Sequence, residues 1–223
     1  MISRLYSPAL IGVSFILMVA SLGLVFLWVP TEATMGVVQR VFYFHVPLAW
    51  VAFLAFFMVL VGSSLYLWKR EEKWDRLAYC SAEIGVVFTT LNLISGVIWA
   101  KSAWGVWWIW DARLTTVLVL WLIYVAYLLV RLYASATQTR SFAAVVGIVG
   151  FVNVPIVFMA IRWWRTVHPG PVIRSGGLSP SMLYTLMVCL VAFTVFYAVL
   201  LAVRTSVRGS EERVEALAHE MRR

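Results

Sequence analysis

Six long apolar runs, separated by short polar stretches, dominate the chain of 223 residues. Each run holds about 20 predominantly apolar residues, which is the length that an α-helix needs to cross a bilayer. The pattern predicts a single all-α, polytopic membrane domain over residues 1–203 and a charged, helical tail over residues 204–223. The six transmembrane helices are expected at about 9–30, 47–68, 76–100, 114–133, 141–161 and 181–203.

Three prolines add detail to these spans. Pro47 and Pro180 lie where the second and sixth spans are expected to begin, and the first turn of a helix tolerates proline. Pro155 lies inside the fifth span, where its missing backbone N–H predicts a kink. The first run is too long for the core of a signal peptide, so we expect it to remain as a helix.

Composition and charge agree with a membrane protein and set its orientation. Hydrophobic residues make up 63% of the chain and charged residues 13%, which excludes a sizeable soluble domain. Twelve of the 18 lysines and arginines lie in the segments on the side of both termini, so both termini are expected to be cytoplasmic. Because the net charge of +8 is divided between two membrane faces, it predicts no nucleic-acid partner. The expected surroundings of the six spans are the lipid bilayer.

Tryptophan is concentrated on the opposite, outer side. Nine of the 12 tryptophans lie at or beyond the expected outer ends of the spans, whereas an anchoring belt would populate both interfaces. The excess lies in the segment "WGVWWIWDAR", residues 104–113. Trp104, Trp107, Trp108 and Asp111 are spaced i, i+3, i+4 and i+7, which predicts a short interfacial helix that presents a flat aromatic plate ending in a carboxylate. A re-entrant or irregular segment is the alternative.

Two histidines share this outer side. His45 lies in "RVFYFHVP" and His168 in "RWWRTVHPGP", whereas His219 lies in the charged tail. Two imidazoles beside indole rings and basic residues suit haem, whose iron takes imidazole ligands, whose ring stacks on aromatics and whose propionates pair with cations. A zinc site formed by His45, His168 and Asp111 would explain the histidines but not the tryptophans. The propionate-side candidates, chosen by charge alone, are Arg40, Lys101, Arg113, Arg162, Arg165 and Arg174.

The same residues carry a resemblance to a known family. "WGVWWIWDARLT" resembles the tryptophan-rich (WWD) signature of the haem-handling membrane proteins of cytochrome c biogenesis. Six spans, "FYFHVP" before the second and "WWRTVH" before the sixth resemble haem exporter protein C (CcmC) of the bacterial cytochrome c maturation system. The resemblance covers nearly the whole chain, and the tail is its least diagnostic part.

The resemblance implies a haem-delivery component and not an enzyme. It implies haem b held at the periplasmic face of the bacterial inner membrane between His45 and His168, and passed to a periplasmic haem chaperone. It also implies partner chains, namely the ATPase and membrane subunits of an ABC transporter and a small single-span subunit. The chain has no phosphate-loop motif, which agrees with energy from partner chains. The tryptophan-rich residues implied in haem stacking are Trp104, Trp107, Trp108, Trp110 and Asp111.

Two other functions remain open at this stage. A b-type electron-transfer protein usually holds haem deep between spans, whereas both histidines here lie at outer ends. A small-solute secondary transporter needs polar residues at the membrane midplane, and Asn92 with Asn153 is a thin set. Glu83, near the inner end of the third span, is an intramembrane acid and therefore a functional candidate. Alternatively, Glu83 has a structural role, in which its side chain reaches the cytoplasmic interface or pairs with Arg76.

Overall fold

The computed structural model describes residues 8–133, 136–168, 170 and 176–222. Regular structure among these residues is helical, apart from one isolated bridge between Glu32 and Gly36. Six stretches of the described chain are long and apolar enough to cross a membrane. The predicted all-α, six-span membrane fold is therefore confirmed.

The helices follow one another in a simple order. The chain runs through α1 (Pro8–Gly23) with its continuation η2 (Leu24–Trp28), η3 (Val37–Val41), α2 (Phe42–Lys69), α3 (Glu72–Trp104), α4 (Ala112–Tyr133), α5 (Ala136–Phe151), α6 (Asn153–Trp163) and α7 (Pro180–Glu220).

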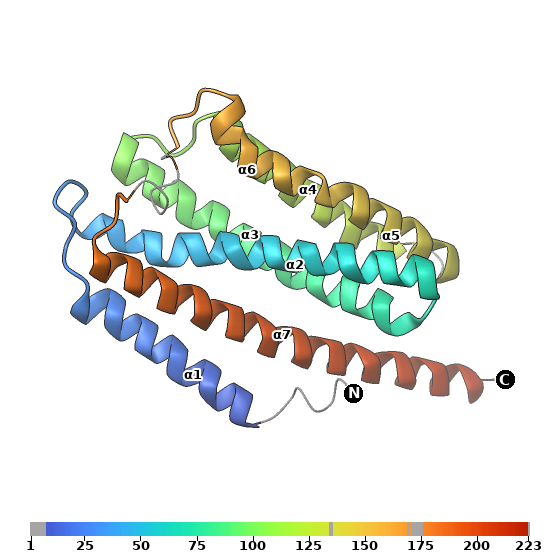
Figure 1. The fold of residues 1–223 in the computed structure, drawn as a ribbon. Coiled ribbons are helices and arrows are strands. Elements are labelled where there is room, and N and C mark those ends of the chain that lie inside the picture. The colour runs from blue at the N-terminus through green and yellow to red at the C-terminus, as the bar shows by residue number, and fades with distance from the viewer. Residues whose placement is uncertain (1–7, 134–135, 169, 171–175, 223) are drawn as a thin grey trace.

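A central pair of helices organises the bundle. Helices α2 and α3 pack along most of their length, with α4, α5 and α6 on one side and α7 and α1 on the other (Figure 1). Close approach is possible because Gly85 has no side chain; a Cβ there would lie 2.5 Å from Phe56 Cε1. The Phe56 ring in turn stacks on Tyr124 of α4, with centroids 3.8 Å apart. One apolar core thus joins α2, α3 and α4.

The prolines behave as predicted in two of three cases. Pro180 is in the first turn of α7, capped by Ser179, as expected. Near Pro155 the fifth span breaks at Val152 into α5 and α6, which confirms the kink. The prediction for Pro47 is wrong, because α2 begins at Phe42 and is preceded by the 3-10 turn η3. The extra turn places His45 on a helix and not in a loop.

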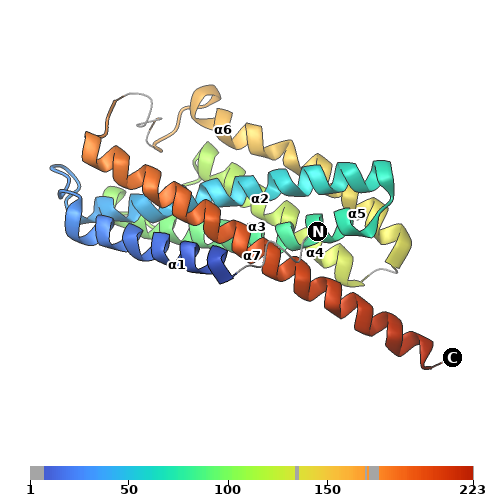
Figure 2. The same cartoon turned by 60° about the horizontal axis from the view of Figure 1, so that its bottom comes forward.

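Ion pairs join the helices at the end of the bundle opposite His45. Glu83 of α3 accepts a hydrogen bond of 2.7 Å from Arg204 Nε of α7, so pairing with Arg76 is wrong for this acid. Arg76 instead pairs with Glu212 at 2.7 Å. The tail continues α7 as one helix to Glu220 and projects beyond the bundle (Figure 2). Glu83 therefore has a structural partner in an interhelical ion pair.

Candidate functional site

The helix ends that carry the described candidate residues lie at one end of the bundle, at the left of Figure 1. At this end α2, α4 and α7 begin and α3 and α6 end. We call it the histidine end, because His45 lies near the start of α2 and His168 lies in the loop that follows α6. The tryptophan-rich segment joins α3 to α4 at the same end.

His45 is held against helix α3. Its Nδ1 lies 2.9 Å from Ser95 Oγ, and its backbone oxygen accepts a hydrogen bond of 3.0 Å from Asn92 Nδ2. The ring also lies over Gly96, where a Cβ would be 3.0 Å from His45 Cε1. Two helices therefore fix the position of this imidazole.

His168 and Arg113 come close to His45, although they are far from it in the chain. Both lie within electrostatic range of the His45 imidazole. His168 is half-buried, and its backbone N–H donates to Thr166 Oγ1 at 3.0 Å. The described residues contain no group of three His, Cys, Asp or Glu placed to hold a metal ion directly, so the zinc alternative gains no support from them. The structure thus brings the two predicted imidazoles and one predicted cation to the same place.

The tryptophan-rich segment is not a helix. Helix α3 ends at Trp104 because Gly105 adopts a left-handed conformation (φ +76°) and donates its N–H to Lys101 O at 3.1 Å. Residues 105–111 then follow an irregular path to α4. The predicted interfacial helix is therefore wrong, and the irregular alternative is what the structure shows. Because α3 ends before Gly105, the spacing of Trp107, Trp108 and Asp111 does not place them on one helix face.

The indole rings also fail to form a single flat plate. Trp99 and Trp104 meet edge to face at 83°, and Trp108 and Trp110 do so at 81°. Trp107 and Trp110 are exposed, whereas Trp108 is partly buried. The indole Nε1 of Trp108 is buried and has no hydrogen-bond partner among the described residues. Trp104 and Trp108 are thus the partly buried tryptophans of the segment, and Trp108 has a buried donor without a partner among the described residues.

Asp111 ties the segment to the loop of His168. Its Oδ1 accepts from the backbone N–H of Arg113 at 2.8 Å and so caps α4, while its Oδ2 accepts from the backbone N–H of Val167 at 3.0 Å. Burial on its own raises the pKa of this carboxyl, but hydrogen bonds from Thr166, Arg113, Val167 and Leu114 outweigh it and lower the pKa below its usual value. We call these contacts the Asp111 latch.

Replacing Asp111 with asparagine is expected to release the His168 loop. Asparagine replaces one of the two carboxylate oxygens with an NH₂ group, which cannot accept from a backbone N–H. One of the two backbone hydrogen bonds is therefore lost, and this loss costs about 1–3 kcal/mol of stability. Hydrogen exchange of the peptide containing Val167 should accelerate. In the native protein the protection of the Val167 amide, measured relative to the intrinsic exchange rate at each pH, should fall in acid: the depressed pKa makes the latch fully stabilising above about pH 4, and the stabilisation is lost as the pH falls through the folded-state pKa.

Glu32→Gln is the matched control for the Asp111 latch. Its Oε2 also accepts two backbone N–H groups, from Thr34 and Met35, in another loop of the chain. Because one oxygen of Glu32 accepts both N–H groups, the amide oxygen of Gln can replace it, so this variant should leave exchange close to native in its own loop and in residues 166–168. Equal exchange of Val167 in Asp111→Asn and in the native protein would contradict the latch.

The basic residues that were predicted from charge alone differ in how close they lie to the histidines and in how buried they are. Arg113 lies in the first turn of α4, near both Asp111 and His45. Lys101 donates to Gly105 O at 2.9 Å and lies 5.7 Å from the Trp107 ring centroid. Arg40 Nε is buried without a partner among the described residues. Arg162 and Arg165 are exposed, and Arg174 lies outside the described residues. Arg113 is therefore the cation best placed beside the histidines.

Sequence reasoning missed the residues that support His45. From the sequence, Asn92 is one of two midplane polar residues, and Ser95 and Gly96 carry no functional signal on their own. The available signal was their spacing: positions i, i+3 and i+4 place three polar or small residues on one face of an apolar helix. The spacing does not say which residue packs against that face.

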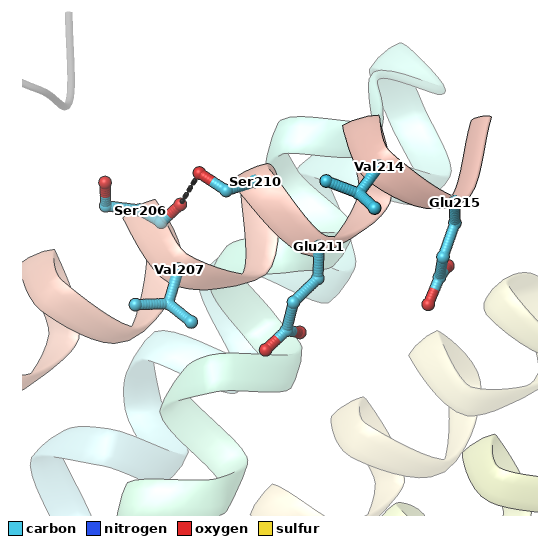
Figure 3. Close-up of a pocket in the computed structure, with 6 residues that line it drawn as sticks. All are labelled: Ser206, Val207, Ser210, Glu211, Val214 and Glu215. Atoms are coloured by element: carbon cyan, nitrogen blue, oxygen red, sulfur yellow. Dashed lines mark hydrogen bonds between the residues drawn. The ribbon is translucent and has the colours of Figure 1, made fainter. Parts of the chain in front are cut away.

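A surface hollow lies elsewhere and is not part of this site. It is open, has a volume of about 510 Å³ and lies in the C-terminal part of α7, whose lining residues Figure 3 labels. It is lined by Ser206, Val207, Ser210, Glu211, Val214 and Glu215.

Comparison with known proteins identifies one family. The family profile described as "Heme exporter protein C" matches residues 1–220. The chain is 36% identical over 175 residues to "Heme exporter protein C" of Bradyrhizobium diazoefficiens, an alignment that covers 77% of this chain and 66% of that protein. It is 33% identical over 180 residues to the protein of the same name from Escherichia coli (strain K12), which covers 78% and 72% of the two chains. The alignment with "Heme exporter protein C" of Haemophilus influenzae has 33% identity over 183 residues and covers 78% and 73%.

Proposed function

This chain belongs to the haem exporter protein C family, and we propose that it binds haem b as cargo at the histidine end and delivers it to a haem chaperone on that side of the membrane. One observation carries the proposal. His45 and His168 come from the start of α2 and from the loop after α6, yet they lie within electrostatic range of each other. Imidazole nitrogens are common axial ligands of haem iron.

The other side chains at the histidine end suit the remainder of a haem molecule. The buried N–H of Trp108 has no acceptor among the described residues, and the Arg113 guanidinium lies near His45. Both are donors that a propionate carboxylate would accept from. Haem, when bound, supplies the iron for the imidazoles and a flat ring for contact with indole. The protein supplies the ligands, the donors and a partly buried position for them.

We also propose that the histidine end is periplasmic and both termini cytoplasmic, in the inner membrane of a bacterium. The excess of lysine and arginine on the side of the termini supports this orientation. Ser102 and Ser210 are exposed near opposite ends of the bundle, and the native cysteines are buried. A membrane-impermeant maleimide should label Ser102→Cys in intact cells, and Ser210→Cys only after permeabilisation. The reverse pattern would overturn the orientation.

The proposed partners are the ATPase and membrane subunits of an ABC transporter, a small single-span subunit and the receiving haem chaperone. The support comes from the family and from the sequence, which holds no phosphate-loop motif. Energy from ATP hydrolysis would then enter through partner chains, and this chain would be a delivery component and not an enzyme. Electron transfer by a permanently bound haem is the competing function.

A transfer experiment separates delivery from electron transfer. The purified, haem-loaded protein is mixed with a periplasmic haem chaperone or with apomyoglobin, and haem in each partner is followed by absorbance after separation. We expect the chaperone to take haem faster than apomyoglobin does, because apomyoglobin only collects haem that has dissociated. Haem that stays in place through repeated reduction and oxidation, with no transfer, would favour the electron-transfer function. A protein that binds no haem would contradict both functions.

A further inference from the structure

We propose that Asn92, Ser95 and Gly96 of α3, which we call the α3 cradle, are positioning residues that hold His45 in the tautomer whose Nε2 is free to bind haem iron. The inference rests on the proposed function, because it assigns a role to His45 as a haem ligand. It goes further by naming three residues, none of them in contact with the iron, that decide which ring nitrogen is available.

Steric contact holds the His45 ring against the α3 cradle. The three cradle residues occupy positions i, i+3 and i+4 of α3 and therefore share one helix face. The His45 ring lies on this face, so close to Gly96 that an added Cβ would approach Cε1 to 3.0 Å. Such a distance is tighter than nine in ten contacts that a real Cβ makes, so the ring would have to shift by a few tenths of an ångström. Gly96 therefore gives the ring its place, and any larger residue would push it away.

Hydrogen bonds around Ser95 set the tautomer of the His45 ring. Ser95 Oγ lies 3.0 Å from Asn92 O, and a carbonyl oxygen can only accept, so the single hydroxyl proton of Ser95 points there. With its proton directed to Asn92 O, Ser95 Oγ presents lone pairs to His45 Nδ1 at 2.9 Å, and Nδ1 is the donor in this arrangement. A neutral imidazole with its proton on Nδ1 has its lone pair on Nε2.

Asn92 completes the arrangement through the backbone. Its Nδ2 donates to His45 O at 3.0 Å and so ties the start of α2 to α3. The same Nδ2 is 3.3 Å from His45 Nδ1, and it would donate to Nδ1 only in the other tautomer, in which Nε2 carries the proton. A metal-binding histidine is usually held in this way, with its second ring nitrogen donating to a fixed acceptor, and loss of such an acceptor typically costs 10–100-fold in affinity.

Substitutions in the full-length protein test the cradle. Ser95→Ala and Gly96→Ala should each weaken haem binding by about 10–100-fold in an absorbance titration. Ser95→Ala should also raise the reduction potential of the bound haem, because an imidazole without an acceptor at Nδ1 is a poorer electron donor to ferric iron. Ser95→Thr, which keeps the hydroxyl, should restore both values. A purely structural role for Ser95 predicts no shift in potential.

Two control variants match these changes. Ser102→Ala removes a hydroxyl that bonds only within α3, to Ile98 O at 3.2 Å. Gly12→Ala adds a methyl group that meets nothing within 4 Å. Both should bind haem as the native protein does. If Ser95→Ala is not recovered folded, Ser95→Cys keeps the volume but accepts poorly and takes its place.

The outcomes separate the cradle from the proposed function. Native haem affinity and potential in Ser95→Ala and Gly96→Ala, together with weak binding in His45→Ala, would overturn the cradle and leave the haem site in place. Native binding in His45→Ala would instead overturn the site itself. Weak binding in all three variants, with recovery in Ser95→Thr, supports the cradle.

Discussion

Purified His45→Ala and His168→Ala proteins are expected to lose the absorption spectrum of haem held by two imidazoles and to bind haem at least about 100-fold more weakly. The reason is that each change removes a proposed axial ligand, whereas loss of a residue that merely supports a ligand already costs 10–100-fold. The two imidazoles also differ in their surroundings: His45 is held between α2 and α3, and His168 is on a loop. Spectra of each haem-titrated variant, recorded at equal concentrations of folded protein, provide the measurement.

The third histidine is the control for this prediction. His219 is exposed near the end of α7, at the end of the molecule opposite the site, so His219→Ala should give the native spectrum and affinity. A double variant without His45 and His168 that still shows the native spectrum would prove the ligand assignment wrong. Free imidazole added to His45→Ala should partly restore the spectrum if the α3 cradle is intact.

The fold was predictable because a bilayer imposes its own length and hydrogen-bond rules. Only a run of about 20 apolar residues can cross as a helix, so six such runs indicate six helices without knowledge of their contacts. The start of α2 was not predictable in this way. The residues before Pro47 are aromatic and only moderately apolar, a composition that fits an interfacial loop as well as a helical turn.

The candidate site was predictable by residue type and not by arrangement. Periodicity favoured a helix through Trp104, Trp107 and Trp108, but one glycine at position 105 ended α3 and removed the basis for that pattern. The latch between Asp111 and Val167 and the contact between His45 and Ser95 join residues far apart in the chain. Such contacts depend on how the helices pack, which residue spacing within one helix does not reveal. The assignment of both histidines as haem ligands stays a prediction.

Among the tryptophans, Trp108→Ala is expected to have the largest effect on haem binding. Stacking on an aromatic ring contributes about 0.5–1.5 kcal/mol beyond area burial. Removal of the indole also uncovers apolar area at about 25 cal/mol per Å². Together these losses are on the order of 2–4 kcal/mol, or roughly 30- to 1,000-fold in affinity. Trp107→Ala should cost less, because Trp107 is exposed and Trp108 is partly buried with an unpaired N–H.

Variants of one position separate the contributions of the ring and of its N–H. Trp108→Phe keeps a flat ring but has no donor, so it should recover part of the lost affinity; Trp108→Leu offers area without a flat face and should recover less. Trp163→Ala is the matched control, because Trp163 is exposed at the same end and ends α6. As a membrane-interface anchor it should affect insertion and abundance only. Haem must therefore be measured per folded protein and not per cell. Equal occupancy in the native protein, Trp108→Ala and Trp163→Ala would mean that the segment anchors the protein in the interface and does not contact haem.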